Sequence, residues 1–110
     1  MSKEERLQMW RALSTLFLDT EIDDETYKYI ARTIKESNYS IQDAENILWY
    51  EVYPVLEKNL KSVAGVWDGW SDTWLLQNLN ISNKQGPIHG DRSIIKEIKR
   101  CWSHVEKSKG

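Results

Sequence analysis

The sequence predicts an all-α fold, a compact bundle of five or six short helices in a single helical domain over residues 1–110. Apolar residues recur with the period of a helix along almost the whole chain, and most of these runs begin beside a residue that can cap a helix. Hydrophobic residues make up 40% of the chain and charged residues 29%, which is typical of a globular domain with its own core. Only the segment near 63–72 permits something else, a short hairpin or an irregular turn.

The N-terminal third predicts two amphipathic helices, at about 3–18 and 24–37. A capping-box pattern beginning at Ser2 opens the first helix, and Asp23 or Asp24 can cap the second. The apolar face of the first helix consists of Leu7, Trp10, Leu13 and Phe17, and that of the second of Tyr27, Ile30, Ala31 and Ile34.

The middle of the chain predicts a third helix at about 41–52, opened by Ser40. Apolar residues fall on both sides of this helix, so we expect it to lie at the centre of the bundle. Pro54 disfavours helical geometry at Tyr53 and suits the first turn of a further helix at about 54–61.

Glu51 is unusual because it falls inside the apolar arc of the third helix, between Ile47 and Leu48. A carboxylate buried alone is costly, so it requires a partner, for which the tryptophan indoles and Arg11 are candidates. Two roles fit: an anchor for a basic side chain of a binding partner, or an internal tie to the tryptophan-rich segment. The second role is the preferred one.

The segment AGVWDGWSDTWLL carries three of the six tryptophans. We expect an Asp-Gly turn at 68–69, after which Ser71 caps a short helix. Leucines surround Trp74, so it is predicted to be in the core, while Trp70 packs at the helix entrance. Trp67 is then the tryptophan most suited to binding a partner.

The short helix ends near Asn80, and the polar stretch 80–92 predicts a loop. Asp91 caps a last amphipathic helix that runs to about Glu106, followed by a frayed tail at 107–110. The predicted core consists of Leu13, Phe17, Ile30, Ile34, Leu48, Val52, Trp74, Ile98 and Trp102.

The broad class follows from what the sequence lacks. There is no apolar segment of the kind found in signal peptides, and no run approaches the roughly 20 apolar residues of a membrane span. The one cysteine, Cys101, cannot form an internal disulfide and suits a reducing compartment. We therefore expect a cytoplasmic protein without a membrane partner.

Charge is divided unequally along the chain. Residues 1–57 hold 12 acidic and 6 basic residues, and residues 58–110 hold 5 acidic and 9 basic residues. An acidic half is a poor surface for nucleic acid and a good one for a basic protein, although the two halves could also neutralise each other. The basic residues of the last helix, typical of a solvated face, are Arg92, Lys96, Lys99 and Arg100.

Catalytic patterns are sparse. His89 and Asp91 have a spacing that a metal site could use, but two ligands do not make a site. Cys101 and His104 share a helix face, where a buried structural thiol is the simpler interpretation. No phosphate-binding loop, dinucleotide fingerprint or hydrolase motif is present in the sequence. We expect no enzyme activity, no catalytic residue, no metal and no cofactor.

Two blocks of sequence, WRALSTLFLDTEI at 10–22 and ILWYEVYPVLEKNLKSVAGVWDGWSDTWL at 47–75, resemble a family of small bacterial proteins of unknown function. The resemblance spans about residues 7–80 and implies a compact helical bacterial protein, with no activity to transfer. The overall profile is also similar to that of immunity proteins, including those of contact-dependent growth inhibition, which are small, often acidic and free of catalytic motifs.

These observations predict a monomeric immunity protein that blocks a basic toxin domain, such as a nuclease, by covering its active site with an acidic surface. A regulatory or adaptor protein, a structural protein that self-associates through its tryptophan segment, and a small enzyme are the alternatives. The expected partner-binding residues are Asp19, Glu21, Asp23, Asp24, Glu25, Asp43, Glu45, Glu51 and Trp67.

Overall fold

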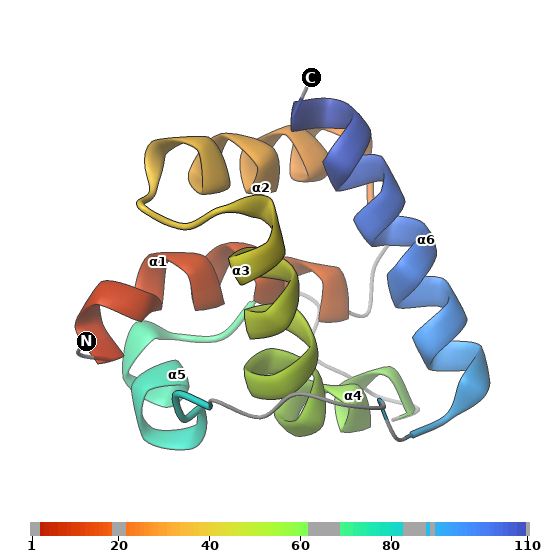
Figure 1. Cartoon of the computed structure of the whole chain (residues 1–110). Helices are drawn as coiled ribbons and strands as arrows, with labels where there is room; N and C mark the ends of the chain where they lie inside the picture. The colour runs from red at the N-terminus through yellow and green to blue at the C-terminus, as the bar shows by residue number, and fades with distance from the viewer. Residues whose placement is uncertain (1–2, 19–21, 62–68, 83–87, 89, 110) are drawn as a thin grey trace.

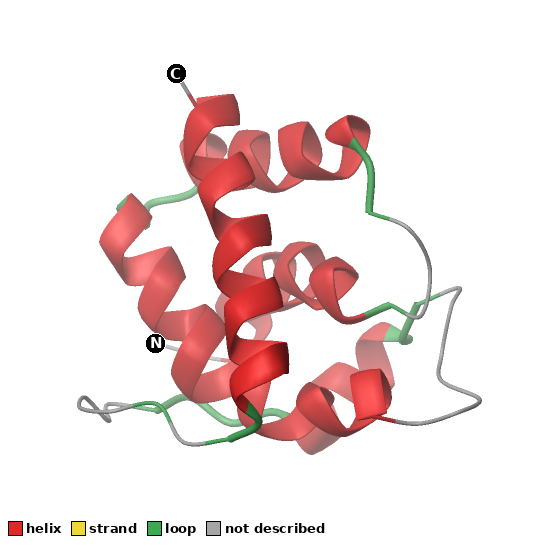
Figure 2. Cartoon of the chain, turned by 90° about the vertical axis from the view of Figure 1, so that its right-hand side faces the viewer, coloured by secondary structure: helices red, strands yellow, loops and turns green. Residues whose placement is uncertain are grey.

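The computed structural model describes residues 3–18, 22–61, 69–82, 88 and 90–109, and within them every regular element is helical (Figures 1 and 2). The predicted all-α class is confirmed. The hairpin considered near 63–72 falls largely on 62–68, outside the described residues. The elements are α1 (Lys3–Ser14), the 3₁₀ turn η1 (Thr15–Phe17), α2 (Asp24–Glu36), α3 (Ile41–Ile47), the π-helical segment η2 (Leu48–Val52), α4 (Tyr53–Lys61), α5 (Asp72–Asn78) and α6 (Arg92–Lys109).

Side-chain caps fix the start of four helices, as the sequence predicts. Asp23 accepts a hydrogen bond from the Thr26 N–H at the start of α2, and Ser71 accepts one from Trp74 N–H at the start of α5. A capping box opens α3 at Ser40. Asp91 Oδ1 accepts the Ser93 N–H (2.8 Å) at the start of α6, which continues to Lys109, beyond its predicted end.

The third and fourth predicted helices join into one helical rod, α3–η2–α4, without an intervening turn. Tyr53 has helical geometry (φ −54°, ψ −48°), contrary to the expected break, and its N–H donates to the Leu48 carbonyl one residue beyond the α-helical partner. A proline ring clashes with the carbonyl of the residue four positions before it, and a wider π turn upstream relieves that clash. Pro54 therefore lies in the first turn of α4 while the rod continues.

The helices pack around two central elements, α1 and the rod. α2 and α6 share the most extensive contact in the molecule, and α1 packs against α2, α5 and the rod. In Figure 1, the C-terminal end of α6 meets α2 at the top of the view, while α5 lies at the lower left. η1 also contacts α4, so the N-terminal helix closes onto the second half of the rod.

The buried residues agree with the predicted core except at one position. Eight of its members are at most 3% exposed: Leu13, Phe17, Ile30, Ile34, Leu48, Val52, Ile98 and Trp102. Trp74 is instead half-buried and packs its ring 6.1 Å from that of Trp70. α5 is a short helix at the edge of the bundle, so only Leu75 of this helix is fully covered. Trp10 and Trp49 supply further aromatic bulk to the core.

Candidate partner-binding surface

The exposed carboxylates Asp23, Asp24 and Glu25 lie in a row at the start of α2, and we call them the α2 acidic group. Asp23 accepts hydrogen bonds from the N–H and the Oγ1 of Thr26, both at 3.0 Å. These bonds lower the pKa of the Asp23 carboxyl, which keeps it ionised in mildly acidic solution. None of the three takes part in the ion pairs found among the described residues, which are Arg6–Glu51, Arg11–Asp72 and Arg100–Glu97.

Asp43 and Glu45 of α3 form a second set, the α3 acidic group. Asp43 is exposed, and its Oδ2 accepts the Ser40 N–H at 3.1 Å within the capping box. Glu45 is half-buried. Its pKa is raised mainly by this burial and secondly by the negative charge of Glu106. Glu45 is therefore the less available of the two for a partner.

The two acidic groups belong to different helices and have different neighbours on α6. Tyr27, one turn along from the α2 acidic group, stacks on His104 with ring centroids 4.9 Å apart. Glu45 is influenced by Glu106, two positions further along α6. Two residues along an α-helix turn by about 200°, so His104 and Glu106 project from nearly opposite sides of α6. A single partner surface is more readily served by the α2 acidic group alone.

Six residues singled out in the sequence lie outside the described residues: Ser2, Asp19, Glu21, Trp67, Asp68 and His89. The capping box expected at Ser2 and the Asp-Gly turn expected at 68–69 therefore stay predictions.

Glu51 is buried (3% exposed) within η2 and has donors on both carboxylate oxygens. Its Oε1 accepts the indole N–H of Trp10 at 2.8 Å. Its Oε2 forms an ion pair with Arg6 and accepts the backbone N–H of Ser82 at 3.1 Å. The contacts support the structural role of Glu51, since a partner cannot reach a carboxylate enclosed in this way.

The partners of Glu51 show which part of the sequence interpretation holds. A tryptophan indole does bind the carboxylate, but Arg11 does not. Arg11 instead pairs with Asp72 at the surface, where two N–H groups reach the two carboxylate oxygens at 3.0 and 2.7 Å. The cation at Glu51 is Arg6, whose guanidinium also lies over the Tyr39 ring, 5.3 Å from its centroid. The sequence could have indicated this pairing, because Arg6 lies one helical turn before Trp10 on the apolar face of the first helix.

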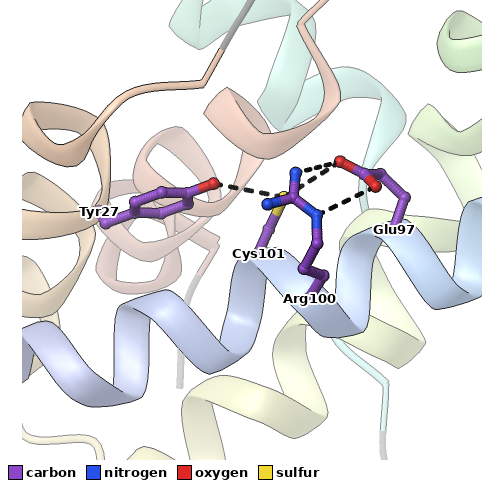
Figure 3. Close-up of polar contacts among 4 residues, drawn as sticks. All are labelled: Tyr27, Glu97, Arg100 and Cys101. Carbon is purple, nitrogen blue, oxygen red and sulfur yellow. Dashed lines mark hydrogen bonds and ion pairs between the residues drawn. The ribbon is translucent and has the colours of Figure 1, made fainter.

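Cys101 lies in a polar cluster between α2 and α6 (Figure 3). The Tyr27 hydroxyl donates to its Sγ at 3.7 Å, and Arg100 of the same helix turn is paired with Glu97. Burial raises the pKa of the Cys101 thiol. Burial and the hydrogen bond to Cys101 raise the pKa of Tyr27 to about 12. A thiol with a raised pKa is a weak nucleophile, so the arrangement fits a structural contact between the two helices.

Two absences hold for the described part of the chain. No helix there combines the length and the apolar character needed to cross a membrane. The same residues contain no group of three or more His, Cys, Asp or Glu side chains positioned for a metal ion.

The fold and these contacts define a class: a compact all-α domain whose buried polar groups serve packing and whose exposed carboxylates begin a well-anchored helix. The chain belongs to the family described as "Domain of unknown function (DUF7079)", whose model matches residues 4–107. The predicted resemblance to an uncharacterised family is thus confirmed at the level of a family of unknown function, and it extends past residue 80 through most of α6. No curated protein and no solved structure matches the chain.

Proposed function

We propose that this chain is a non-enzymatic binding protein that neutralises a bacterial toxin domain by covering its basic active-site cleft. The observation that carries the proposal is the α2 acidic group. Its three carboxylates are exposed, and none forms an ion pair among the described residues. Such charges are available to a basic partner and speed its association.

The α2 acidic group is also held in place. Tyr27 is 4% exposed, contacts both Cys101 and His104 of α6, and lies one turn after the acidic group. Ile30 and Ile34 continue this buried face of α2. Because the helix that carries the carboxylates is already ordered, a partner need not order it on binding, which favours affinity.

The test is to look for a toxin-like open reading frame next to the gene and to co-express its product with this chain, followed by a growth assay and a binding titration over increasing salt. We expect the chain to rescue growth and to bind more weakly as salt rises, because exposed charges are screened. The double reversal Asp24→Lys with Glu25→Lys should weaken binding and abolish rescue. Asp23 is kept so that the cap of α2 is preserved.

The matched control is the double reversal Glu4→Lys with Glu36→Lys. These two carboxylates are also exposed, so the change in net charge is the same but its place on the surface differs. The control variant should bind and protect like the wild type. Equal loss in both variants, or binding that ignores salt and the reversal at Asp24 and Glu25, would contradict the proposal.

A second candidate, self-association through the tryptophan segment, is favoured by the half-buried pair Trp70 and Trp74. Tryptophans that keep part of their surface exposed are common anchors of interfaces. This candidate predicts a dimer in sedimentation experiments that persists at high salt and dissociates in a Trp70→Ala variant. A monomer at all concentrations tested would exclude it.

A further inference from the structure

The outer face of α6 carries a row of exposed cations. The residues of this helix that are buried in the core are Ile98, Cys101, Trp102 and Val105. Each residue turns an α-helix by about 100°, so a different set of side chains lies on the side that faces away from the core. The exposed cations on that side, which we call the α6 basic row, are Arg92, Lys96, Lys99 and Lys107.

The charge of the α6 basic row is largely uncompensated. None of its four members takes part in the ion pairs found in the described part of the chain. Arg100, at the edge of the row, is instead paired with Glu97 of its own helix. Lys99 acts on Glu45 of α3 through its charge, without forming an ion pair with it. The row is therefore a positive surface that the chain neutralises only in part.

The first half of the row is the part best placed to meet an anion. The α2 acidic group lies one turn before Tyr27, which contacts Cys101 and His104 in the second half of α6. Those carboxylates therefore oppose an anion mainly at the second half of the helix. The first half, from Arg92 to Lys99, rises about 10 Å and lies at the lower right of Figure 1, away from α2.

The composition of the row indicates which anion it fits. It holds no aromatic side chain on which the bases of a single strand could stack, and no large apolar side chain that could enter a lipid bilayer or anchor a protein interface. Cations alone are sufficient to bind the phosphates of a DNA duplex. One strand of the duplex carries a phosphate about every 3.4 Å along its axis, so a row of about 10 Å faces about three of them. Duplex RNA is recognised mainly across its minor groove, which a straight row of cations does not address.

We propose that Arg92, Lys96 and Lys99 form a docking surface for the phosphate backbone of double-stranded DNA, which they bind without reading its sequence. Because the chain as a whole carries a net charge of −2, we expect binding at the weak end of the non-specific range, on the order of 10⁻⁴ M. This surface departs from the sequence interpretation, which took the same residues as a solvated face. It is distinct from the α2 acidic group and does not depend on the proposed function.

The test is fluorescence anisotropy of a labelled DNA duplex of random sequence, about 20 base pairs long, titrated with up to about 1 mM protein at several salt concentrations. We expect a saturable rise in anisotropy at low salt. Three phosphate contacts predict that the logarithm of the binding constant falls against the logarithm of salt concentration with a slope of about −3. A single strand and an RNA duplex of the same length should bind more weakly. No saturable binding of the DNA duplex at about 20 mM salt, or tighter binding of either other probe, would overturn the proposal.

Lys96→Gln with Lys99→Gln should weaken binding of the duplex by about tenfold or more and make the salt slope shallower by about two. The matched control is Lys35→Gln with Lys58→Gln, which removes two exposed cations from other helices and changes the net charge equally. The control should bind DNA like the wild type. All four residues are exposed, so both variants should melt at the wild-type temperature. Equal losses in the two variants would show a general effect of charge and contradict the docking surface.

The double reversal Asp24→Lys with Glu25→Lys separates this proposal from the proposed function. It changes the α2 acidic group and leaves the α6 basic row intact, so it should bind DNA at least as tightly as the wild type while losing the toxin domain. A loss of DNA binding in this variant would contradict the assignment of the DNA surface to α6.

Discussion

Glu51 and Glu57 lie on the same helical rod, yet their environments differ completely. Glu51 is 3% exposed and receives hydrogen bonds from Arg6, Trp10 and the Ser82 backbone. Glu57 is half-buried, and its carboxylate lies beside the Tyr53 hydroxyl of the same helix, whose pKa it raises. One carboxylate is fixed by donors from distant segments of the chain, and the other by a neighbour one helical turn away. The comparison separates a carboxylate that ties the rod to α1 from one that has no ion pair among the described residues.

The cause of the difference is the element that faces each carboxylate. Glu51 faces α1, which presents a guanidinium and an indole on adjacent turns. Glu57 faces the backbone of Gly90, which has no side chain to offer.

The largest expected effect comes from breaking the satisfied side of this comparison. Glu51→Gln keeps the shape of the side chain but removes the charge that pairs with the buried Arg6 guanidinium, which should cost about 3–5 kcal/mol of unfolding free energy. Urea denaturation followed by circular dichroism measures this change. Glu57→Gln, measured in the same way, should cost about 1 kcal/mol or less, because Glu57 is half-buried, has no ion pair among the described residues, and an amide oxygen can still accept from Tyr53.

Similar losses in Glu51→Gln and Glu57→Gln would show that the two carboxylates are equivalent and would remove the distinction between them. A double-mutant cycle with Arg6→Met and Glu51→Gln provides the internal check, because the two changes should be strongly non-additive.

An intermediate effect is expected from Gly90→Ala. The added Cβ would lie 2.1 Å from the Tyr53 hydroxyl, and Gly90 has a positive φ of 152°, so both packing and backbone oppose the substitution. Overpacking of this kind costs about 1–3 kcal/mol. Thermal or urea unfolding measures the loss.

Tyr53→Phe should recover part of that loss when combined with Gly90→Ala, because the nearest remaining ring atom lies 3.1 Å from the added Cβ. A Gly90→Ala variant as stable as the wild type would contradict the close approach of Gly90 to the Tyr53 hydroxyl.

The smallest effect concerns alkaline pH. The pKa of Tyr27 is raised from 10.0 to about 12, and that of Tyr53 is raised as well, both mainly by burial. A raised pKa means that the folded state holds the phenol proton more tightly than the unfolded state does. The contribution of the two protonated phenols to the free energy of unfolding is therefore complete below pH 10. It is then lost as the pH rises from 10 through the folded pKa.

Unfolding free energy measured between pH 9 and 12 should therefore fall, and Tyr27→Phe and Tyr53→Phe should each make the fall shallower. Stability that is constant over this interval would contradict the buried, protonated state of both phenols.

Much of the fold could be predicted because its signals are local. The caps at Asp23, Ser40, Ser71 and Asp91 lie within a turn of the groups they bind, so the sequence places them correctly. The buried faces follow from helical spacing for the same reason. Trp74 was misjudged because its burial depends on α5 lying at the edge of the bundle, which the spacing of apolar residues does not reveal.

The candidate sites were harder to predict because they depend on distant contacts. The Arg6–Glu51 pair and the approach of Gly90 to Tyr53 and Glu57 join segments far apart in the chain. Periodicity specifies which face of a helix is buried, but not which element covers it.

The π turn in the rod also sets a rule for which insertions and deletions the chain tolerates. Each bond of this turn spans one residue more than an α-helical bond, as between Tyr53 N–H and the Leu48 carbonyl. Because the wider turn takes up one extra residue, removing one residue from 48–52 would restore a plain α-helix and keep the faces of α3 and α4 in nearly the same register. Removing one residue from the regular part of α3 or α4 would instead rotate the residues that follow by about 100° and turn the buried face of the rod out of the core. The π turn is therefore the place on the rod where a single deletion is tolerated best.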